Sequence, residues 1–134
     1  MKPTILVVDD EKPIRDLIRL NLENEGYRVL EANDGREALE IALAPDSEVE
    51  ILITDILMPY MNGKDLATRI SSARPQIKVL FVSAYSADIL TSMKLCPPGS
   101  DYIRKPFQRK ELLSRLEGLH QSSRVWTAVN SGLG

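Results

Sequence analysis

The chain has 134 residues, a length that suits one domain with one hydrophobic core. Its formal net charge of −2 gives nucleic acid no general attraction to the chain, so we expect no nucleic-acid partner. No apolar run approaches the roughly 20 residues that cross a bilayer, and the single cysteine excludes an internal disulfide, so we expect a cytoplasmic protein without a membrane partner.

Short apolar runs alternate with helical patterns along the chain. Thr4–Val8 is a continuous apolar run, typical of a strand that is covered on both faces. Glu11–Glu25 then places apolar residues at helical spacing, with Pro13 near its start and Gly26 just after its end. Four further strand–helix pairs are predicted, at Tyr27–Ala32 and Asp34–Ala44, Glu50–Thr54 and Lys64–Ala73, Lys78–Val82 and Ala87–Leu95, and Asp101–Ile103 and Gln108–Leu119.

This alternation predicts a single α/β domain. Five strands that are each followed by a helix form a doubly wound (βα)5 unit, in which a parallel five-stranded sheet carries helices on both faces. We expect the domain to span residues 1–120. Residues 121–134 show no strong pattern and are expected to form a C-terminal tail or linker, and the sequence assigns no role to Trp126 within it.

Polar and charged residues stand where four of the predicted strands end. Asp9 and Asp10 follow the first strand, Asp55 the third, Ser83 the fourth and Lys105 the fifth. In a doubly wound parallel sheet, functional groups gather outside the carboxyl ends of the strands. We therefore expect these side chains to share one pocket.

The chemistry of that pocket follows from its charges. Three carboxylates that lie together repel one another unless cations intervene, and Lys105 supplies only one cation. Oxygen ligands without His or Cys select a hard divalent ion such as Mg²⁺. A carboxylate such as Asp55 can attack phosphorus to give an aspartyl phosphate, with Mg²⁺, Lys105 and the Ser83 hydroxyl neutralising the phosphoryl oxygens. The alternative from the residues alone is that Asp9 and Asp10 only cap the first helix.

Four motifs resemble those of the receiver domains of two-component response regulators. They are VVDDE at 7–11, TDILMPYMNG at 54–63, VSA at 82–84 and YIRKPF at 102–107. The resemblance covers about residues 3 to 119. It implies a flavodoxin-like sheet of order 2-1-3-4-5 and a protein that takes a phosphoryl group from a phosphohistidine. Its partner would be a histidine kinase or a histidine phosphotransfer domain.

The resemblance also implies a role for each residue of the acidic pocket. Asp55 would be the phosphoacceptor and therefore the modified residue. Asp9 and Asp10 would be the acidic pair that holds Mg²⁺, with Asp10 and Asp55 as direct ligands and Asp9 mainly in the outer shell. The backbone carbonyl of Leu57 would also face the metal, and Lys105 would contact the phosphoryl group.

A second set of implied roles concerns signalling. Ser83 and Tyr102 would be the switch pair that changes the face formed by the fourth helix, fifth strand and fifth helix, a face that also allows a homodimer. In the family, the positions two residues after the phosphoacceptor and two after the switch hydroxyl flank the approach of hydrolytic water. Leu57 and Tyr85 occupy them here, so we expect slow loss of the phosphoryl group.

Two other function classes are open to comparison. A phosphohydrolase of the haloacid dehalogenase type needs a second acid two residues after its nucleophile, but Leu57 stands there. An unphosphorylated interaction module with a receiver fold usually lacks one of the acids or the lysine, and this chain has all of them. In either case the domain would not be a conventional receiver. If it is a receiver, we expect no enzymatic activity beyond its own phosphorylation and slow dephosphorylation.

The context of the domain is a separate question. Met1 stands three residues before the first strand, which suits an N-terminal receiver or a single-domain regulator. The stretch LCPPGSDYIRKPF, residues 95–107, instead resembles receivers at the C-terminus of hybrid histidine kinases. This stretch favours the hybrid interpretation.

Overall fold

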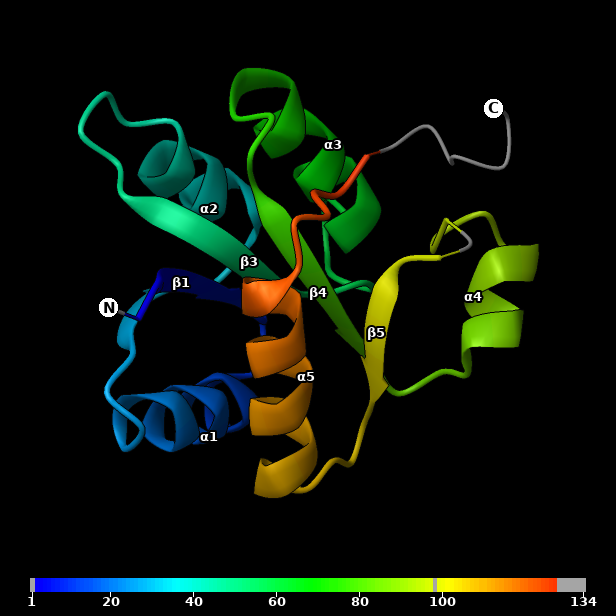
Figure 1. The fold of residues 1–134 in the computed structure, drawn as a ribbon. Helices are drawn as coiled ribbons and strands as arrows, with labels where there is room; N and C mark the ends of the chain where they lie inside the picture. The colour runs from blue at the N-terminus through cyan, green and yellow to red at the C-terminus, as the bar shows by residue number, and fades with distance from the viewer. Residues whose placement is uncertain (1, 98, 128–134) are drawn as a thin grey trace.

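The five predicted strands form one parallel sheet in the computed structural model, which describes residues 2–97 and 99–127 (Figure 1). The strands are β1 Thr4–Val8, β2 Arg28–Ala32, β3 Val49–Asp55, β4 Lys78–Ser83 and β5 Asp101–Arg104. The helices are α1 Lys12–Glu23, α2 Gly35–Ala42, α3 Gly63–Ala73, α4 Ala87–Ser92 and α5 Arg109–Gln121. The sheet order is β2-β1-β3-β4-β5, so the predicted doubly wound, flavodoxin-like fold is confirmed.

Helices cover both faces of the sheet because successive strand residues point to opposite sides. Ile5 and Val7 of β1 face a cluster that includes Leu22 of α1 and buried leucines of α5. Leu6 and Val8 face the other cluster, which α2, α3 and α4 complete. The three central strands therefore read as continuous apolar runs, as expected for strands buried on both faces. In the part of the chain that the structure describes, no helix is long and apolar enough to span a bilayer.

The fourth helix is shorter than its sequence predicted. Instead of reaching Leu95, α4 ends at Ser92, and Met93 is its C-cap. Lys94 adopts a positive φ of 60°, a left-handed conformation that stops an α-helix. Apolar periodicity alone extended the prediction over these last residues.

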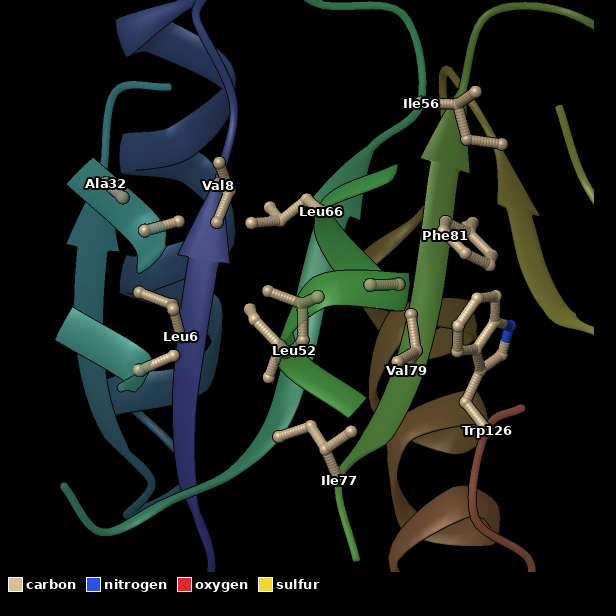
Figure 2. Close-up of a cluster of buried hydrophobic side chains, with 14 of the residues drawn as sticks. Leu6, Val8, Ala32, Leu52, Ile56, Leu66, Ile77, Val79, Phe81 and Trp126 are labelled. Carbon is tan, nitrogen blue, oxygen red and sulfur yellow. The ribbon is translucent and has the colours of Figure 1, made fainter. Parts of the chain in front are cut away.

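Residues 122–127, here called the C-terminal strap, pack against the sheet. The strap leaves α5 on one face and reaches the opposite face, where Trp126 joins the cluster of α2, α3 and α4. Figure 2 shows its indole beside Phe81 and Val79 of β4. A segment with no sequence pattern is thus an ordered part of the fold up to the last residue described.

Candidate functional site

The carboxyl ends of β1 and β3 bring two acids together. β1 and β3 are neighbours in the sheet, with Val8 in register with Thr54. The next residues along each strand are therefore Asp9 and Asp55, which lie side by side at the same edge. Both are buried, and Asp55 is 7% exposed.

The start of α3 fixes the backbone around Asp55. The N–H of Gly63 donates to the carbonyl oxygen of Ile56 over 2.8 Å. A Cβ on Gly63 would lie 2.3 Å from the carbonyl oxygen of Asp55, so only glycine allows α3 to approach the end of β3 this closely. The side chain of Asn62 caps the helix by accepting from the N–H of Asp65.

Lys105 connects the ends of three strands. Its ammonium nitrogen lies 2.9 Å from an oxygen of Asp9 and 3.0 Å from an oxygen of Asp55. Its backbone N–H donates to the carbonyl oxygen of Ser83 over 2.8 Å. The peptide bond to Pro106 is cis. The predicted meeting of Asp9, Asp55 and Lys105 is therefore present in the structure.

The pKa values of Asp55 and Lys105 reflect burial and mutual attraction. Burial raises the pKa of Asp55, and the charge of Lys105 only partly offsets that rise. Burial acts to lower the pKa of Lys105, but its hydrogen bonds and charge interactions with Asp9 and Asp55 outweigh burial, so its pKa is raised. Lys105 therefore remains a cation, and Asp55 is a carboxylate that gains from further positive charge.

The acidic group suits a hard divalent ion, although its membership differs from the expected set. Carboxylate oxygens of Asp9, Glu11 and Asp55 lie within 4.8 Å of one another. Asp10 is exposed and outside that group. Glu11 was not among the expected site residues; the run of three acids after the first strand was the available signal. An all-oxygen set of this kind is the chemistry that Mg²⁺ prefers.

The turn between β1 and α1 is fixed by bonds that the sequence did not reveal. An oxygen of Asp9 accepts from the N–H of Glu11 over 2.9 Å, and Arg15 donates to the carbonyl oxygen of Asp9 over 2.7 Å. Arg15 also pairs with Glu31 at 3.4 Å. Glu11 is the N-cap residue of α1 and makes no side-chain cap hydrogen bond. Helix capping alone therefore does not account for these acids.

The remaining predicted residues lie at or just after the ends of β3 and β4 and within β5. Ser83 is buried, and its hydroxyl accepts from the N–H of Tyr85 over 3.2 Å. Tyr102 is partly buried, and its hydroxyl donates to the carbonyl oxygen of Tyr85. The N–H of Leu57 donates to an oxygen of Asp55 over 3.4 Å, while the side chains of Leu57 and Tyr85 are exposed. The structure links Ser83 and Tyr102 through the Tyr85 backbone.

Known proteins share this arrangement over most of the chain. The response regulator receiver domain profile matches residues 5–117. A probable transcriptional regulatory protein of Picosynechococcus sp. is 37% identical over 123 residues, which cover 88% of this chain and 49% of that protein. The chain therefore spans about half the length of this curated relative.

Two solved structures are also similar. The response regulator TrrA of Thermotoga maritima, in complex with Mg²⁺ and BeF, gives a TM-score of 0.74 at 34% identity and covers 89% of this chain and 99% of its own. The receiver domain of the hybrid histidine kinase CckA gives a TM-score of 0.70 at 33% identity, with 88% and 99% covered. With the profile match, these likenesses show that the chain belongs to the response regulator receiver domain family of two-component systems.

Proposed function

We propose that Asp55 is the residue of this receiver that accepts the phosphoryl group. The observation that carries the proposal is the double contact of Lys105, which lies 2.9 Å from Asp9 and 3.0 Å from Asp55. Asp55 ends the central strand, is almost fully buried, and has a raised pKa because of that burial. Such a carboxylate gains when its charge is shared with a phosphoryl group near a fixed cation.

The proposed reaction moves one phosphoryl group from a histidine nitrogen of the partner to a carboxylate oxygen of Asp55. A carboxylate oxygen of Asp55 forms a bond to phosphorus as the bond from phosphorus to the donor histidine nitrogen breaks, and the imidazole, whose other ring nitrogen carries a proton, leaves as the neutral base. Lys105 stays protonated and neutralises phosphoryl oxygens, and the Ser83 hydroxyl donates to one of them. The chain positions the groups and supplies charge, so little covalent chemistry is required of it.

The acids around Asp55 would hold Mg²⁺, which supplies positive charge to the phosphoryl oxygens when it is bound. From the family resemblance we assign Asp10 and Asp55 as direct ligands, Asp9 as mainly an outer-shell ligand, and the backbone carbonyl of Leu57 as a further ligand. Asp10 is exposed and outside the acidic group in the structure, so its side chain would have to turn toward Asp55 to bind the ion. The grouping of Asp9 and Asp55 with Glu11 supports the metal site and adds Glu11 to its candidates.

Response regulators interact with histidine kinases or histidine phosphotransfer proteins, and we propose the same class of partner for this chain. Ser83 and Tyr102 would act as the switch pair and would alter the face of α4, β5 and α5, which would also serve a homodimer. The shared backbone contact of these two residues at Tyr85 supports the coupling. We place the protein in the cytoplasm, where such kinases present their phosphohistidine, with no nucleic-acid contact by this domain.

For the larger protein, the short α4 and the connection through Gly99 favour a receiver of the hybrid histidine kinase type. The similarity to the receiver of the hybrid kinase CckA supports this context. We take residues 1–120 as the receiver proper and residues 121–134 as a C-terminal tail or linker. The phosphohydrolase and the unphosphorylated module are not favoured, because the family assignment and the retained acids both point to a phosphoacceptor.

Intact-mass measurement after treatment with acetyl phosphate and Mg²⁺ tests the proposal. We expect one phosphoryl group on the parent chain and none on Asp55→Asn or after addition of EDTA. Asp46→Asn, which alters an exposed acid on the surface, is the matched control and should be modified like the parent. Persistent stoichiometric modification of Asp55→Asn would sink the assignment.

A further inference from the structure

The C-terminal strap is anchored at its start by a lysine of the sheet. The ammonium of Lys78, the first residue of β4, donates to the carbonyl oxygens of Leu119 and His120 over 3.0 Å and 2.8 Å, and also to that of Ser122. These carbonyls lie in the last turn of α5 and at its C-cap, where few backbone N–H groups are available to them. The chain is thereby turned from the end of α5 toward the opposite face of the sheet.

Trp126 anchors the far end of the strap. The residue is 7% exposed, and its ring meets that of Phe81 edge-on, with centroids 5.8 Å apart and planes at 75°. Its indole N–H donates to the hydroxyl of Ser100 over 3.2 Å, and its backbone N–H donates to the carbonyl oxygen of Ile77 over 3.3 Å. A buried tryptophan whose indole N–H is hydrogen-bonded makes a specific contact rather than loose apolar packing.

Arg124 adds a directional contact between these two anchors. One nitrogen of its guanidinium lies 3.0 Å and 2.9 Å from the two carboxylate oxygens of Asp101. Its side chain is largely exposed, so the pair contributes orientation more than stability. An arginine and a tryptophan two residues apart thus meet one complementary surface, made by β4 and the approach to β5.

This surface adjoins the proposed switch pair on both strands. Phe81 stands two residues before Ser83 on β4, and Ser100 stands two residues before Tyr102 at the start of β5. Tyr102 also packs against the same cluster of buried side chains as Trp126. Figure 2 shows the indole against Phe81 of β4, and Val82, the next residue of that strand, is in register with Asp55.

We propose that the strap is an intramolecular ligand whose docking opposes phosphorylation of the receiver. The inference rests on the proposed function of Asp55. The contacts of Trp126 and Arg124 fit β4 and the β5 approach in the arrangement in which Lys105 pairs directly with the carboxylate of Asp55. A rearrangement at Ser83 and Tyr102 would disturb those contacts, so docking stabilises the unmodified arrangement, and by linkage modification loosens the strap.

The first test uses Trp126 as a reporter, because it is the only tryptophan in the chain. Acrylamide quenching of its fluorescence is measured before and after saturation with Mg²⁺ and beryllofluoride, a phosphoryl mimic, and ¹⁹F NMR follows bound beryllofluoride separately. We expect weak quenching in the free protein and about a twofold stronger quenching in the saturated one. Unchanged quenching at full saturation would overturn the inference while leaving the proposed function intact.

Absence of bound beryllofluoride in the ¹⁹F spectrum would instead overturn the proposed function, and the coupling with it. A quenching constant typical of exposed tryptophan in the free protein would show that the strap is not docked and would also overturn the inference. The three results are distinguishable because the two signals are independent.

The second test measures the reciprocal effect. Trp126→Ala should lower the beryllofluoride concentration at half-saturation by about fivefold, the lower end of typical coupling. Arg124→Ala, which leaves the buried indole in place, should lower it in the same direction by a smaller factor. Leu22→Ala removes a buried side chain from the opposite layer and controls for loss of stability alone; it should leave half-saturation unchanged. Unchanged or weaker binding in both strap variants would contradict the proposal.

Discussion

Asp55 is held in a position that is unfavourable for its own charge. Burying a carboxylate is costly unless it is paired and hydrogen-bonded. Lys105 is shared between Asp55 and Asp9, so one cation serves two neighbouring acids at 3.0 Å and 2.9 Å. The raised pKa of Asp55 indicates that Lys105 only partly offsets the cost of burying this carboxylate. Further positive charge near Asp55 would lower this residual cost.

The pH dependence of stability follows from that raised pKa. Without Mg²⁺, the folded protein binds more protons at Asp55 than the unfolded chain does, between the ordinary pKa of the carboxyl and its raised folded value. The free energy of unfolding therefore falls as pH rises through this window. Asp55→Asn should be more stable than the parent near neutral pH, by roughly 1 kcal/mol.

Urea denaturation of both proteins in EDTA between pH 4 and pH 8 checks this expectation. The difference should shrink as pH falls through the folded pKa of Asp55. A parent that is more stable than Asp55→Asn at neutral pH would contradict the electrostatic account.

Removing Lys105 should leave two buried acids facing each other. Lys105→Met should destabilise the fold by about 3 kcal/mol, the magnitude typical of a broken buried ion pair. The double variant Asp55→Asn, Lys105→Met should recover more of that loss than the stabilisation by Asp55→Asn alone supplies, because only Asp9 then remains unpaired. Denaturant unfolding of the four proteins gives the coupling energy. A double variant whose stability change equals the sum of the two single changes would show that Lys105 and Asp55 do not interact as described.

The exposed side chains at the site mouth predict a long-lived phosphoryl group. Hydrolysis needs a water in line behind phosphorus, and Leu57 offers no side-chain hydrogen bond to orient it. By the family pattern, Tyr85 would add bulk beside the approach. Replacing Leu57 with Asn and Tyr85 with Glu together should speed decay on the order of tenfold. Leu43→Asn, an exposed leucine away from the site, is the control; equal decay of double variant and parent would refute the expectation.

At the scale of elements, the junctions between strands and helices fix the site. The turn after β1 is held by Arg15 and the start of α3 by Gly63, and each restricts one acid-bearing strand end. The glycine is needed for space, because backbone atoms of Asp55 and Ile56 fill the volume that a Cβ would occupy. Rigid elements of this kind keep a site in its working geometry.

Gly63→Ala tests the close approach of α3 to β3. A Cβ placed 2.3 Å from the Asp55 carbonyl oxygen forces backbone to shift, so we expect a loss of about 2 kcal/mol in urea unfolding and slower phosphorylation. Gly118→Ala is the matched control, since nothing lies within 4 Å of its Cβ and it sits inside α5. That change should stabilise the protein by about 0.5 kcal/mol. A Gly63→Ala protein with parental stability would show that α3 can move away without cost.

Sequence patterns predicted the parts of the fold that depend on local periodicity. All five strands and four of the helices lie close to their predicted ranges, because buried runs and amphipathic spacing are visible in one dimension. The end of α4 was missed because a left-handed Lys94 leaves no periodic signal. Asp9, Asp55 and Lys105 were predicted as neighbours because a parallel sheet gathers its strand ends. Glu11 could have been found from the run of three acids after the first strand, whereas the contacts of Arg15 and the docking of Trp126 depend on tertiary structure that spacing does not encode.

At the scale of the whole molecule, strands that end at the acidic site also pack against the helices and the strap that cover the two faces of the sheet. β4 carries Ser83 at its end and Phe81 in its middle, so it borders both the site and the C-terminal strap. β5 carries Tyr102 and leads directly into Lys105. A change at Asp55 would therefore reach β4 and β5, and these strands also pack against α4, α5 and the strap. A two-state switch requires such a connection between its site and its surface.

Chemical trapping of the phosphorylated residue tests the central claim most directly. The chain is phosphorylated with acetyl phosphate and Mg²⁺, reduced with borohydride, and digested for peptide mass spectrometry, because reduction converts an aspartyl phosphate to homoserine. The account predicts homoserine at position 55 and at no other aspartate. Homoserine at Asp9, Asp10 or elsewhere, with residue 55 still aspartate, would contradict it.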